Sequence, residues 1–469
     1  MHEFSSVPDP AEALSRFSQL SHCLFLDSSR NIASETGQEL GRYSFLMADP
    51  IDWIECHQVA DCPDALERID SLLDRHAADR LKGLPPMQGG LAGMVSYDFN
   101  QAMEAVAKPR CDQFETPLLA FGFYDVVLAW DHQQDRAWLI SQPWNNAADR
   151  LQLFIKLLQP GPLPFGLNAR ESQTTETVSV DQQFPVRDRD GLVSNFSPQS
   201  YLAAVQQAIE HIYAGDIFQV NLAQRLLTAA SGSSVDLYQK LRQCNPAPFG
   251  GYFDFGSGQI VSASPERLVS VVDGMIETRP IKGTRLRTGQ PTVDDEVSRQ
   301  LEHSEKDRAE NIMIVDLMRN DLSRICTDDS VHVTQLCKVE QYQSVMHLVS
   351  AVQGRLTDNA CRPSELLPAI FPAGSITGAP KVRSMEIIAE LEPDARGAYC
   401  GSMGYFAANG DVDLNVLIRT ITASKGWWQL PVGGGIVSQS TPESEYEETW
   451  TKAAAMLEAI ESVNRGEPN

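Results

Sequence analysis

Residues 197–222 read SPQSYLAAVQQAIEHIYAGDIFQVNL, a helix pattern followed at once by a strand pattern. Ser197 and Pro198 are typical of an N-cap and a first helical residue. Apolar residues then recur at helical spacing as far as Gly215, a typical helix stop. The apolar run over 217–222 predicts a strand. A chain that passes so directly from helix to strand is neither all-α nor all-β.

The same alternation extends outward from this stretch and indicates three regions. Residues 1–160 mix short strand and helix patterns, residues 161–196 are polar and breaker-rich and predict a linker or long loop, and residues 197–465 form the principal region. In the principal region we expect strands at 251–255, 268–272, 403–406, 416–422 and 427–431, and helices at 304–322, 381–391 and 441–463. The predicted class is therefore α/β or α+β.

The composition is that of a soluble globular chain with a large negative charge. The 469 residues include 62 acidic and 38 basic side chains, which gives a formal net charge of −24. Such a chain repels phosphate backbones and anionic membranes, so we expect no nucleic-acid partner and no membrane partner. Nine scattered cysteines, no signal sequence and no apolar run near ~20 residues indicate a cytoplasmic protein.

One lysine lies in a segment that restricts its backbone and surrounds it with cations. Lys282 lies between Ile281 and Gly283, with Arg279 and Arg285 close by in the sequence. Apolar neighbours desolvate an ammonium group and nearby guanidinium groups disfavour its charge, and both effects lower the pKa of a lysine. The segment therefore predicts a lysine that can act as a nucleophile.

Carboxylates recur on two of the predicted helices. Glu445, Glu448 and Lys452 are spaced i, i+3 and i+7, which places them on one side of the helix over 441–463, although a charged outer face would explain them as well. Glu310 lies near the start of the helix over 304–322, which is apolar nearly all round over 312–318, so we expect this helix to be buried. A buried carboxylate is costly unless it is paired or bound to a metal, and carboxylates around a hard cation suit Mg²⁺.

Two glycine-rich segments complete the candidate pocket. Residues 372–381 read PAGSITGAPK and lead into a helix, and residues 433–435 are three glycines after a strand. Such segments bring backbone N–H groups close to an anion, although tight turns alone would also explain them. Together with the lysine and the glutamates, they predict a pocket for a small polycarboxylate, Mg²⁺ and one activated amine.

These segments resemble those of the chorismate-utilising enzymes, a family that includes anthranilate, aminodeoxychorismate, isochorismate and salicylate synthases. The resemblance covers about residues 197 to 460, and residues 1–160 match only loosely. The matching segments are AGDIFQVNL (214–222), SPE (264–266), PIKGTR (280–285), AENIMIVDLMRND (309–321), MHLVS (346–350), PAGSITGAPK (372–381), RGAY (396–399), LIRT (417–420), GGGIV (433–437) and ETWTKA (448–453).

The resemblance implies a fold and a set of roles. The fold is α+β with mixed α/β content, in which two large, mainly antiparallel sheets pack face to face with helices outside. Lys282 is the implied nucleophile, Glu266 the general acid with a pKa raised by burial, and His347 lies near the chemistry. The implied Mg²⁺ ligands are Glu310 and Glu448, with Glu445 helping directly or through water. The implied contacts to chorismate are Gly283, Thr284, Tyr399, Arg419, Gly433, Gly435 and Lys452.

Lys282 also indicates a branch of the family. At this segment the sequence of anthranilate synthases looks like Pro-Ile-Ala-Gly-Thr. The sequence of aminodeoxychorismate synthases looks like Pro-Ile-Lys-Gly-Thr, and this chain resembles them there. In the second branch the lysine adds at C2 of chorismate while the C4 hydroxyl leaves, and ammonia then adds at C4 and expels the lysine. The resemblance thus implies a transferase that forms 4-amino-4-deoxychorismate for 4-aminobenzoate and folate synthesis.

The resemblance further implies partners and leaves alternatives open. We expect a separate glutamine amidotransferase subunit as the source of ammonia and an aminodeoxychorismate lyase downstream, because neither segment is visible in the chain. An anthranilate synthase component I and a non-catalytic regulatory subunit are the alternatives. The N-terminal region of this family can hold tryptophan. Cys400 replaces a glycine that is usual beside the tyrosine, and we expect it to shift the backbone at Tyr399.

Overall fold

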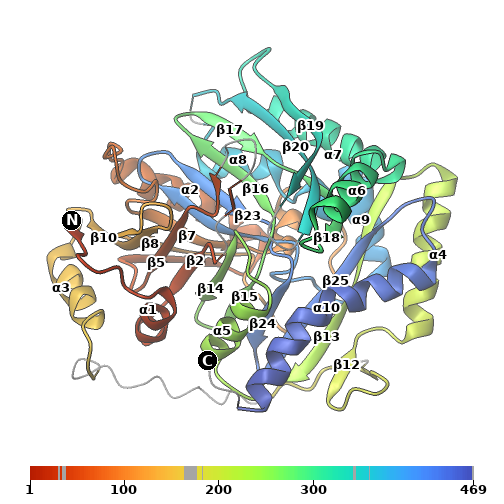
Figure 1. The fold of residues 1–469 in the computed structure, drawn as a ribbon, viewed down its shortest axis with the longest axis horizontal. Coiled ribbons are helices and arrows are strands. Elements are labelled where there is room, and N and C mark those ends of the chain that lie inside the picture. Colours follow the sequence, from red (N-terminus) through yellow and green to blue (C-terminus); the bar gives the residue numbers. More distant parts are fainter. Residues whose placement is uncertain are drawn as a thin grey trace.

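The computed structural model of the chain describes residues 1–29, 32–33, 39–162, 177–181, 183–341, 345–358 and 360–466. Within these ranges, two large antiparallel sheets form the centre of the molecule (Figure 1). The larger sheet has the order β1 (His2–Glu3), β10 (Arg136–Ser141), β9 (Val126–Asp131), β5 (Tyr43–Met47), β2 (Leu24–Asp27), β14 (Gly250–Asp254), β15 (Gly258–Ser262), β24 (Thr420–Ser424), β25 (Trp427–Ile436), β13 (Gln219–Ala229), β12 (Leu192–Ser194) and β11 (Phe184–Pro185), with β21 (Gly378–Ala379) beside β13.

The second sheet holds most of the strands that position the candidate site. Its order is β18 (Ile281–Leu286), β20 (Val345–Arg355), β17 (Met275–Thr278), β16 (Arg267–Val272), β23 (Val412–Asn415), β22 (Ser402–Ala407), β7 (Gly90–Val95), β8 (Leu119–Tyr124) and β6 (Asp52–Cys56), with β19 (His332–Gln341) beside β20. A small separate pair consists of β3 (Ile32–Ala33) and β4 (Glu39–Leu40).

Both large sheets combine strands from the two ends of the chain. In the larger sheet β2 pairs with β14, and in the second sheet β7 pairs with β22. The predicted regions 1–160 and 197–465 are therefore interleaved in space. Part of the predicted linker also joins the larger sheet, because residues 184–185 and 192–194 form β11 and β12 at its edge, whereas residues 163–176 lie outside the described ranges.

The two sheets pack face to face, as the resemblance implied. Leu24 of β2 and Met47 of β5 come from the larger sheet, and Met94 of β7 and Met403 of β22 come from the second; all four are buried in one apolar cluster. Because side chains alternate along a strand, each sheet contributes one face to this layer and leaves the other for helices. The predicted α+β fold class is confirmed.

Helices cover the outer faces of the sheets. Figure 1 shows α10 and α5 lying across β24 and β13 of the larger sheet, and an apolar cluster with Leu241, Trp428 and Met456 joins these layers. The helices are α1 (Pro10–Phe17), α2 (Cys62–Arg75), α3 (Ala147–Leu157), α4 (Pro198–Ala214), α5 (Ser234–Cys244), α6 (Pro291–Glu302), α7 (Glu305–Ser323), α8 (Pro363–Ile370), α9 (Lys381–Leu391) and α10 (Pro442–Asn464), with the short 3₁₀ turns η1 (Val59–Asp61), η2 (Tyr97–Ala102) and η3 (Gly374–Ile376).

Local capping interactions fix the ends of two helices at the predicted residues. The Ser197 hydroxyl accepts a hydrogen bond from the backbone N–H of Ser200 at 3.0 Å, and Gly215 closes α4 at φ +83°. Thr441 caps α10 in the same way through the N–H of Ser444. A side chain that satisfies an otherwise unpaired N–H of the first turn favours one starting point for a helix. The predicted starts of α4 and α10 are confirmed.

Two predictions about local structure were wrong. The strand expected over 416–422 begins only at Thr420, since Arg419 adopts φ +52° and Val416 bonds the carbonyl of Glu266. The helix α7 was expected to be buried all round, but Ile312 is 44% exposed because only one face of α7 packs on β20. Glu310 is consequently only partly buried.

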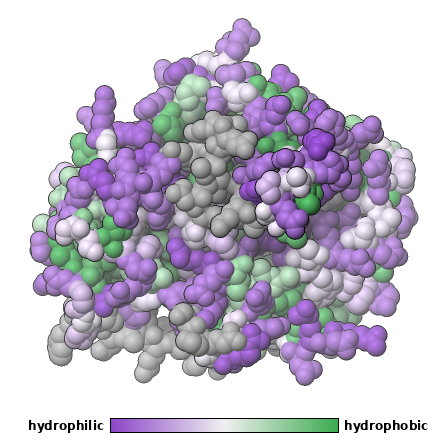
Figure 2. Space-filling view, in the orientation of Figure 1, coloured by the Kyte–Doolittle hydropathy of each residue, from purple (hydrophilic) through white to green (hydrophobic). Residues whose placement is uncertain are grey.

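The molecular surface agrees with the acidic composition. The face drawn in Figure 2 is mostly hydrophilic, with scattered apolar side chains between charged ones. Throughout the described ranges, every helix is too short or too polar to cross a membrane.

Candidate active site

A β-bulge directs Lys282 out of its strand. Along the β18–β20 ladder, Lys282 pairs with Leu348 and Thr284 pairs with His347, so Gly283 is left without a partner residue. Gly283 has φ +60°, and a Cβ atom there would lie 2.8 Å from Cδ1 of Leu301. Only glycine fits this position without displacing α6, and a bulge re-aims the neighbouring side chain. The sequence Lys282-Gly283 thus fixes the direction of the amine.

The pKa of Lys282 is lowered, and of the two expected causes only burial accounts for it. Burial of the amine is the main cause, and the charges of Glu310 and Glu266 oppose it. The guanidinium groups are not among the main causes because both are neutralised: Arg279 pairs with Glu340, and Arg285 lies 3.1 Å from Asp307. The predicted direction is confirmed, and its attribution to the arginines was wrong.

Glu266 and Lys282 are held by the same residue. The hydroxyl of Ser375 donates to Oε1 of Glu266 at 2.7 Å, and Nζ of Lys282 donates to the backbone carbonyl of Ser375 at 3.3 Å. Glu266 is only 5% exposed. Burial raises the pKa of its carboxyl above the ordinary value, while the Ser375 hydroxyl and the charge of Lys282 oppose that rise. The environment is that of a carboxylic acid able to retain a proton.

The carboxylates of Glu310 on α7 and of Glu445 and Glu448 on α10 include neighbours close enough for their charges to interact. Burial raises the pKa of Glu310 and of Glu445, and the negative charge of Glu448 raises both further. Burial also acts on Glu448, but Lys452 at 2.6 Å holds the pKa of this carboxyl below its ordinary value. A Cβ atom at Gly434 would lie 3.1 Å from Glu445 and 3.5 Å from Glu448, so the backbone of β25 lies against these two carboxylates.

The donor chemistry of these carboxylates fits the predicted Mg²⁺. Carboxylate oxygens are the ligands that Mg²⁺ prefers, and a divalent cation would relieve the repulsion between Glu310, Glu445 and Glu448. In the described part of the chain, no three His, Cys, Asp or Glu side chains already converge to metal-binding distance. Mg²⁺ usually keeps several waters and uses one or two carboxylates, so such convergence is not required for it. The Mg²⁺ site stays a prediction.

Three of the predicted chorismate-binding residues contact one another. Lys452 donates from Nζ to the carbonyl of Gly433 at 2.8 Å, and Arg419 donates from Nη1 to the carbonyl of Lys452 at 3.2 Å. Burial lowers the pKa of Arg419, while the charges of Tyr399 and Glu448 oppose this. Arg419, whose left-handed backbone precedes β24, thereby contacts α10. Gly433 and Lys452 thus belong to one constellation with Arg419.

His347 and Thr284 lie opposite each other on neighbouring strands. They form a pair of the β18–β20 ladder, and His347 is partly buried. The side chain of Thr284 lies outside the described part of the structure. A place for His347 in the chemistry stays a prediction.

A buried ion pair that the sequence reasoning missed supports Tyr399. Arg396 forms two hydrogen bonds to Glu392, at 2.6 and 2.8 Å, and its guanidinium lies 5.7 Å from the ring centroid of Tyr399. The same guanidinium lies 4.6 Å from the ring of Tyr97. Both members are nearly inaccessible to solvent. The spacing Glu392–Arg396, i and i+4, is a signal for such a pair in a helix, but α9 ends at Leu391, before both residues.

A buried amide also faces the site. Gln219 is fully buried, and neither its Oε1 nor its Nε2 has a hydrogen-bond partner among the described residues. A Cβ atom at Gly435 would lie 2.6 Å from Nε2 of Gln219, so the amide lies directly against the glycine-rich strand. A buried polar group without a partner is costly, which indicates a ligand-binding role. Sequence alone gave no reason to separate Gln219 from the other strand residues.

Cys400 occupies a backbone conformation that favours glycine. It has φ +62° and is buried, and its N–H bonds the carbonyl of Leu417 at 2.8 Å. A non-glycine residue in the left-handed region costs about 1 kcal/mol or more. The resemblance places glycine here in relatives, and this conformation accounts for that preference. The expected shift of the backbone at Tyr399 stays a prediction.

We expect the variant Cys400→Gly to be more stable than Cys400→Ala by about 1 kcal/mol. Both variants lose the buried sulfur, but only glycine relieves the left-handed conformation. Free energies of unfolding in urea measure the difference. At Cys56, a buried strand residue, the same two substitutions should show the opposite order, because glycine weakens a strand. An alanine variant at position 400 as stable as the glycine variant would contradict the prediction.

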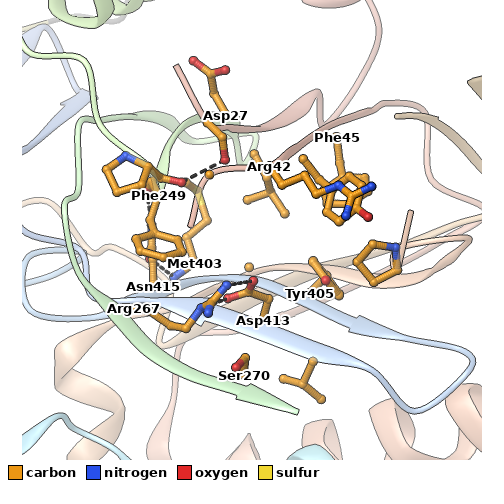
Figure 3. A pocket seen from close by; sticks show the side chains of 18 of the residues that line it. Asp27, Arg42, Phe45, Phe249, Arg267, Ser270, Met403, Tyr405, Asp413 and Asn415 are labelled. Carbon is orange, nitrogen blue, oxygen red and sulfur yellow. Dashed lines mark hydrogen bonds and ion pairs between the residues drawn. The ribbon is translucent and has the colours of Figure 1, made fainter. Parts of the chain in front are cut away.

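A second cavity lies between the two sheets, apart from this constellation. Its volume is about 240 Å³, and Phe45, Phe249, Met403 and Tyr405 line it (Figure 3). The Arg267–Asp413 ion pair, at 2.8 Å, closes one side. Glu266, the candidate acid, directly precedes Arg267 in the chain.

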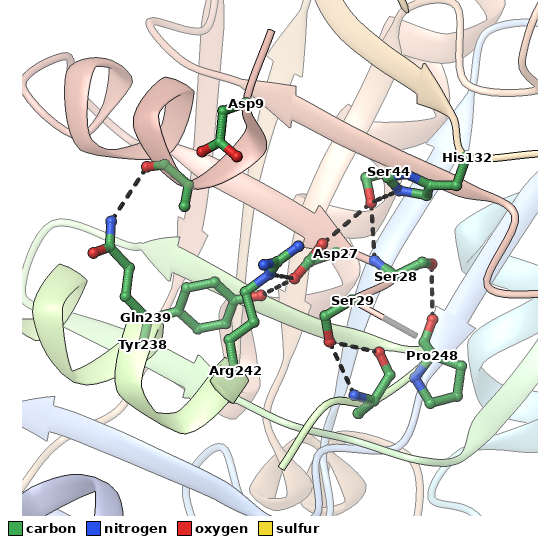
Figure 4. Close-up of polar contacts among 12 residues, drawn as sticks. Asp9, Asp27, Ser28, Ser29, Ser44, His132, Tyr238, Gln239, Arg242 and Pro248 are labelled. Carbon is green, nitrogen blue, oxygen red and sulfur yellow. Dashed lines mark hydrogen bonds and ion pairs between the residues drawn. The ribbon is translucent and has the colours of Figure 1, made fainter. Parts of the chain in front are cut away.

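A polar network fixes the strand that forms the opposite wall. The Asp27 carboxylate points away from the cavity and accepts hydrogen bonds from Tyr238 at 2.7 Å, Arg242 at 2.6 Å and Ser44 at 3.2 Å (Figure 4). His132 lies 2.7 Å from the Ser44 hydroxyl. These bonds hold Asp27 in place, and residues 26–28 contribute to this wall of the cavity.

The chain is similar to known proteins over most of its length. The chain matches the chorismate binding enzyme family over residues 27–458. It is 36% identical to aminodeoxychorismate synthase component 1 of Bacillus subtilis, with 94% of this chain and 92% of the relative covered. It is 38% identical to anthranilate synthase component 1 of Thermus thermophilus, with 85% and 82% covered. The crystal structure of anthranilate synthase component I from Streptococcus pneumoniae has a TM-score of 0.74 at 31% identity, with 88% and 92% covered.

The chain therefore belongs to the chorismate binding enzymes. Identity alone does not separate the two branches, since aminodeoxychorismate synthase components at 36–39% identity overlap with anthranilate synthase components at 33–38%. The choice between them depends on the site.

Proposed function

We propose that this enzyme aminates chorismate at C4 with ammonia and forms 4-amino-4-deoxychorismate. The observation that carries the proposal is the placement of Lys282, an amine with a lowered pKa, directed by a bulge and sharing Ser375 with Glu266. An alanine at this position, the residue expected in anthranilate synthases, would leave the site without a nucleophile. A positioned lysine instead allows covalent catalysis.

The proposed chemistry consists of two displacements. The neutral amine of Lys282 forms a bond to C2 of chorismate, the ring double bonds shift, and the C4 hydroxyl leaves as water after taking a proton from Glu266. Ammonia then forms a bond to C4, the double bonds shift back, and the C2–N bond to Lys282 breaks. The sum is chorismate plus ammonia giving 4-amino-4-deoxychorismate plus water, with the lysine regenerated.

The remaining residues bind and orient the substrate. Arg419 can form a bidentate pair with a carboxylate of chorismate, and Lys452, Tyr399, Thr284 and the glycines Gly283, Gly433 and Gly435 complete its contacts. Glu310 and Glu448 would hold Mg²⁺, with Glu445 helping, and the bound ion would neutralise the ring carboxylate. We propose that the unpartnered amide of Gln219 binds the incoming ammonia or a polar group of the substrate.

The partners follow from the chemistry. The relatives are named component 1, which implies a second component. We propose that the second component is a glutamine amidotransferase that supplies ammonia, and that an aminodeoxychorismate lyase acts downstream toward 4-aminobenzoate and folate in the cytoplasm.

The test is product formation from chorismate, Mg²⁺ and ammonium, followed by addition of aminodeoxychorismate lyase. We expect 4-aminobenzoate only after the lyase is added. Anthranilate in place of 4-aminobenzoate would overturn the C4 assignment and favour the anthranilate branch. No Mg²⁺-dependent chorismate binding in calorimetry would favour a non-catalytic subunit.

We further propose that the second cavity takes tryptophan, which the N-terminal region of this family can hold. Its lining by Phe45, Phe249 and Met403 suits an indole, and the Arg267–Asp413 pair suits an amino acid's charged groups (Figure 3). We expect tryptophan to raise the melting temperature of the protein. The variant Ser270→Phe, which fills the cavity, should weaken binding at least ~10-fold, or ~1.4 kcal/mol.

Isothermal titration of tryptophan into both proteins measures this effect. Ser270→Ala is the matched control and should bind tryptophan as the parent does, because alanine does not fill the cavity. Equal tryptophan affinity of the phenylalanine variant, or no heat with the parent, would contradict the proposal.

A further inference from the structure

The short turn η3 holds Ser375 rigidly between the candidate acid and the candidate nucleophile. A Cβ atom at Gly374 would lie 2.4 Å from Leu317, so the turn packs closely on α7. Thr377 donates from its hydroxyl to the carbonyl of Ala373 at 2.9 Å and closes the turn internally. Arg396 donates to the carbonyl of Ile376 at 3.2 Å. Ser375 is itself only 5% exposed, so solvent does not compete for its polar atoms.

The two polar groups of Ser375 contact two different functional side chains. Its hydroxyl donates to Oε1 of Glu266, and its carbonyl accepts from Nζ of Lys282. A hydroxyl that donates to one carboxyl oxygen makes that oxygen the acceptor, so the acid proton of Glu266 is left on the other oxygen, Oε2. A neutral amine has two N–H groups and one lone pair, and a hydrogen bond to the Ser375 carbonyl fixes one of those N–H groups.

We infer that Ser375 is a positioning residue for the reaction, which directs the acid proton of Glu266 through Oε2 and orients the lone pair of Lys282. The inference rests on the proposed roles of those two residues. Ser375 acts through them and forms no bond to the substrate in this scheme. One residue thereby couples the departure of the C4 hydroxyl to the attack of the amine at C2, two events that the proposed chemistry requires together.

Removal of the hydroxyl tests the inference. We expect Ser375→Ala to lower kcat at least ~10-fold, part of the ~10²–10⁴-fold that positioned acid catalysis contributes, with the KM for chorismate within about 2-fold. Ser375→Thr keeps the donor and should restore most of the rate. Thr357→Val, which removes a hydroxyl that bonds the carbonyl of Ile325 away from η3, is the control and should retain kcat.

The pH dependence of kcat/KM gives a second measurement, and a general loosening of the fold would not shift its basic limb. Glu266 must be protonated to act, so activity falls as pH rises through its pKa. The Ser375 hydroxyl lowers that pKa. Its loss should therefore shift the basic limb of kcat/KM to higher pH. If the alanine variant does not fold, Ser375→Gly removes the same donor with less change in the close-packed turn.

The outcomes separate this inference from the proposed function. An alanine variant with unchanged kcat, or one that loses rate without moving the basic limb, overturns the role of Ser375. If the parent enzyme makes anthranilate, the C4 assignment fails, but the shift of the basic limb can still be measured on anthranilate formation. A shift there would keep Ser375 as the positioning residue of the acid, and an unmoved limb would overturn it.

Discussion

The variant Lys282→Ala is expected to lose formation of 4-amino-4-deoxychorismate by at least ~10³-fold, since residues that act as one catalytic unit show losses of this order or larger. No other amine takes its place: the nearest lysine of the constellation, Lys452, is bonded to Glu448 and to the carbonyl of Gly433. Some ammonia should instead attack C2 directly, so a small amount of anthranilate is expected. Product analysis after chorismate, Mg²⁺ and ammonium measures both effects.

Two controls separate the nucleophile from the charge. Lys282→Arg keeps a cation but cannot become a neutral amine, so it should be as inactive as the alanine variant. Lys306→Ala removes an exposed lysine whose charge also acts on Glu310 and Glu448, and it should retain most of the activity. Unchanged 4-aminobenzoate yield in Lys282→Ala would contradict the covalent role.

The covalent intermediate itself can be observed. In the absence of ammonia the second displacement cannot occur, so incubation with chorismate should leave an adduct with the mass of chorismate less water. Intact-protein mass spectrometry and peptide mapping should place it at Lys282 and find none in the alanine variant. Because burial lowers the pKa of Lys282 and only the neutral amine attacks, adduct formation should increase as pH rises through that lowered pKa.

The helix ends were predictable because their causes are local. Ser197, Pro198 and Gly215 each act on backbone groups within a few residues, so a short window of sequence contains the whole signal. The helix Lys381–Leu391 was predicted to the residue. The sheets were not predictable in this way, since one partner of β2 and one of β7 lie more than two hundred residues away, in β14 and β22. The family resemblance supplied the two packed sheets, but it did not give these long-range strand pairs.

Two predictions were wrong because they depend on contacts with distant parts of the chain. Residues 416–422 are apolar enough for a strand, but the peptide groups of Val416 and Leu417 bond two loops in place of a neighbouring strand. The arginines near Lys282 are close in sequence but neutralised by Glu340 and Asp307, which are distant in sequence. Charge effects depend on the partner of each group, and partners across a fold cannot be read from spacing.

The candidate site likewise contains residues that were predictable from their own segment and residues that were not. The types of its residues, lysine, glutamates and glycines, were visible because each stands out in its own segment. The supporting contacts were not, because Ser375, Gln219 and the Glu392–Arg396 pair become notable only through what they touch or lack. A residue whose role is to hold another residue has no signal of its own in a single sequence.

The variant Glu310→Gln is expected to weaken Mg²⁺ binding at least ~100-fold, since even changes behind the ligands of a metal site cost 10–100-fold. Glutamine keeps the size of the side chain and removes its charge. Calorimetric titration with Mg²⁺ in the presence of chorismate measures the loss, and chorismate turnover should fall with it. Glu305→Gln, an exposed change on the same helix, is the matched control and should bind Mg²⁺ as the parent does.

Stability supplies a second readout that does not depend on turnover. Without Mg²⁺, Glu310 is a partly buried carboxylate beside Glu448, so the glutamine variant should be at least as stable as the parent. With Mg²⁺, the parent should gain stability by ligand binding and the variant should not. Equal gains in melting temperature would exclude Glu310 as a ligand.

The same substitution also tests the link between the metal site and the nucleophile. The charge of Glu310 raises the pKa of Lys282 and opposes the effect of burial. Its removal should lower that pKa further, so adduct formation in Glu310→Gln should begin at lower pH than in the parent. A bound Mg²⁺ neutralises the same carboxylate and should act in the same direction. The glutamates would then have two effects: they hold the substrate through the ion, and they keep Lys282 protonated until the ion arrives.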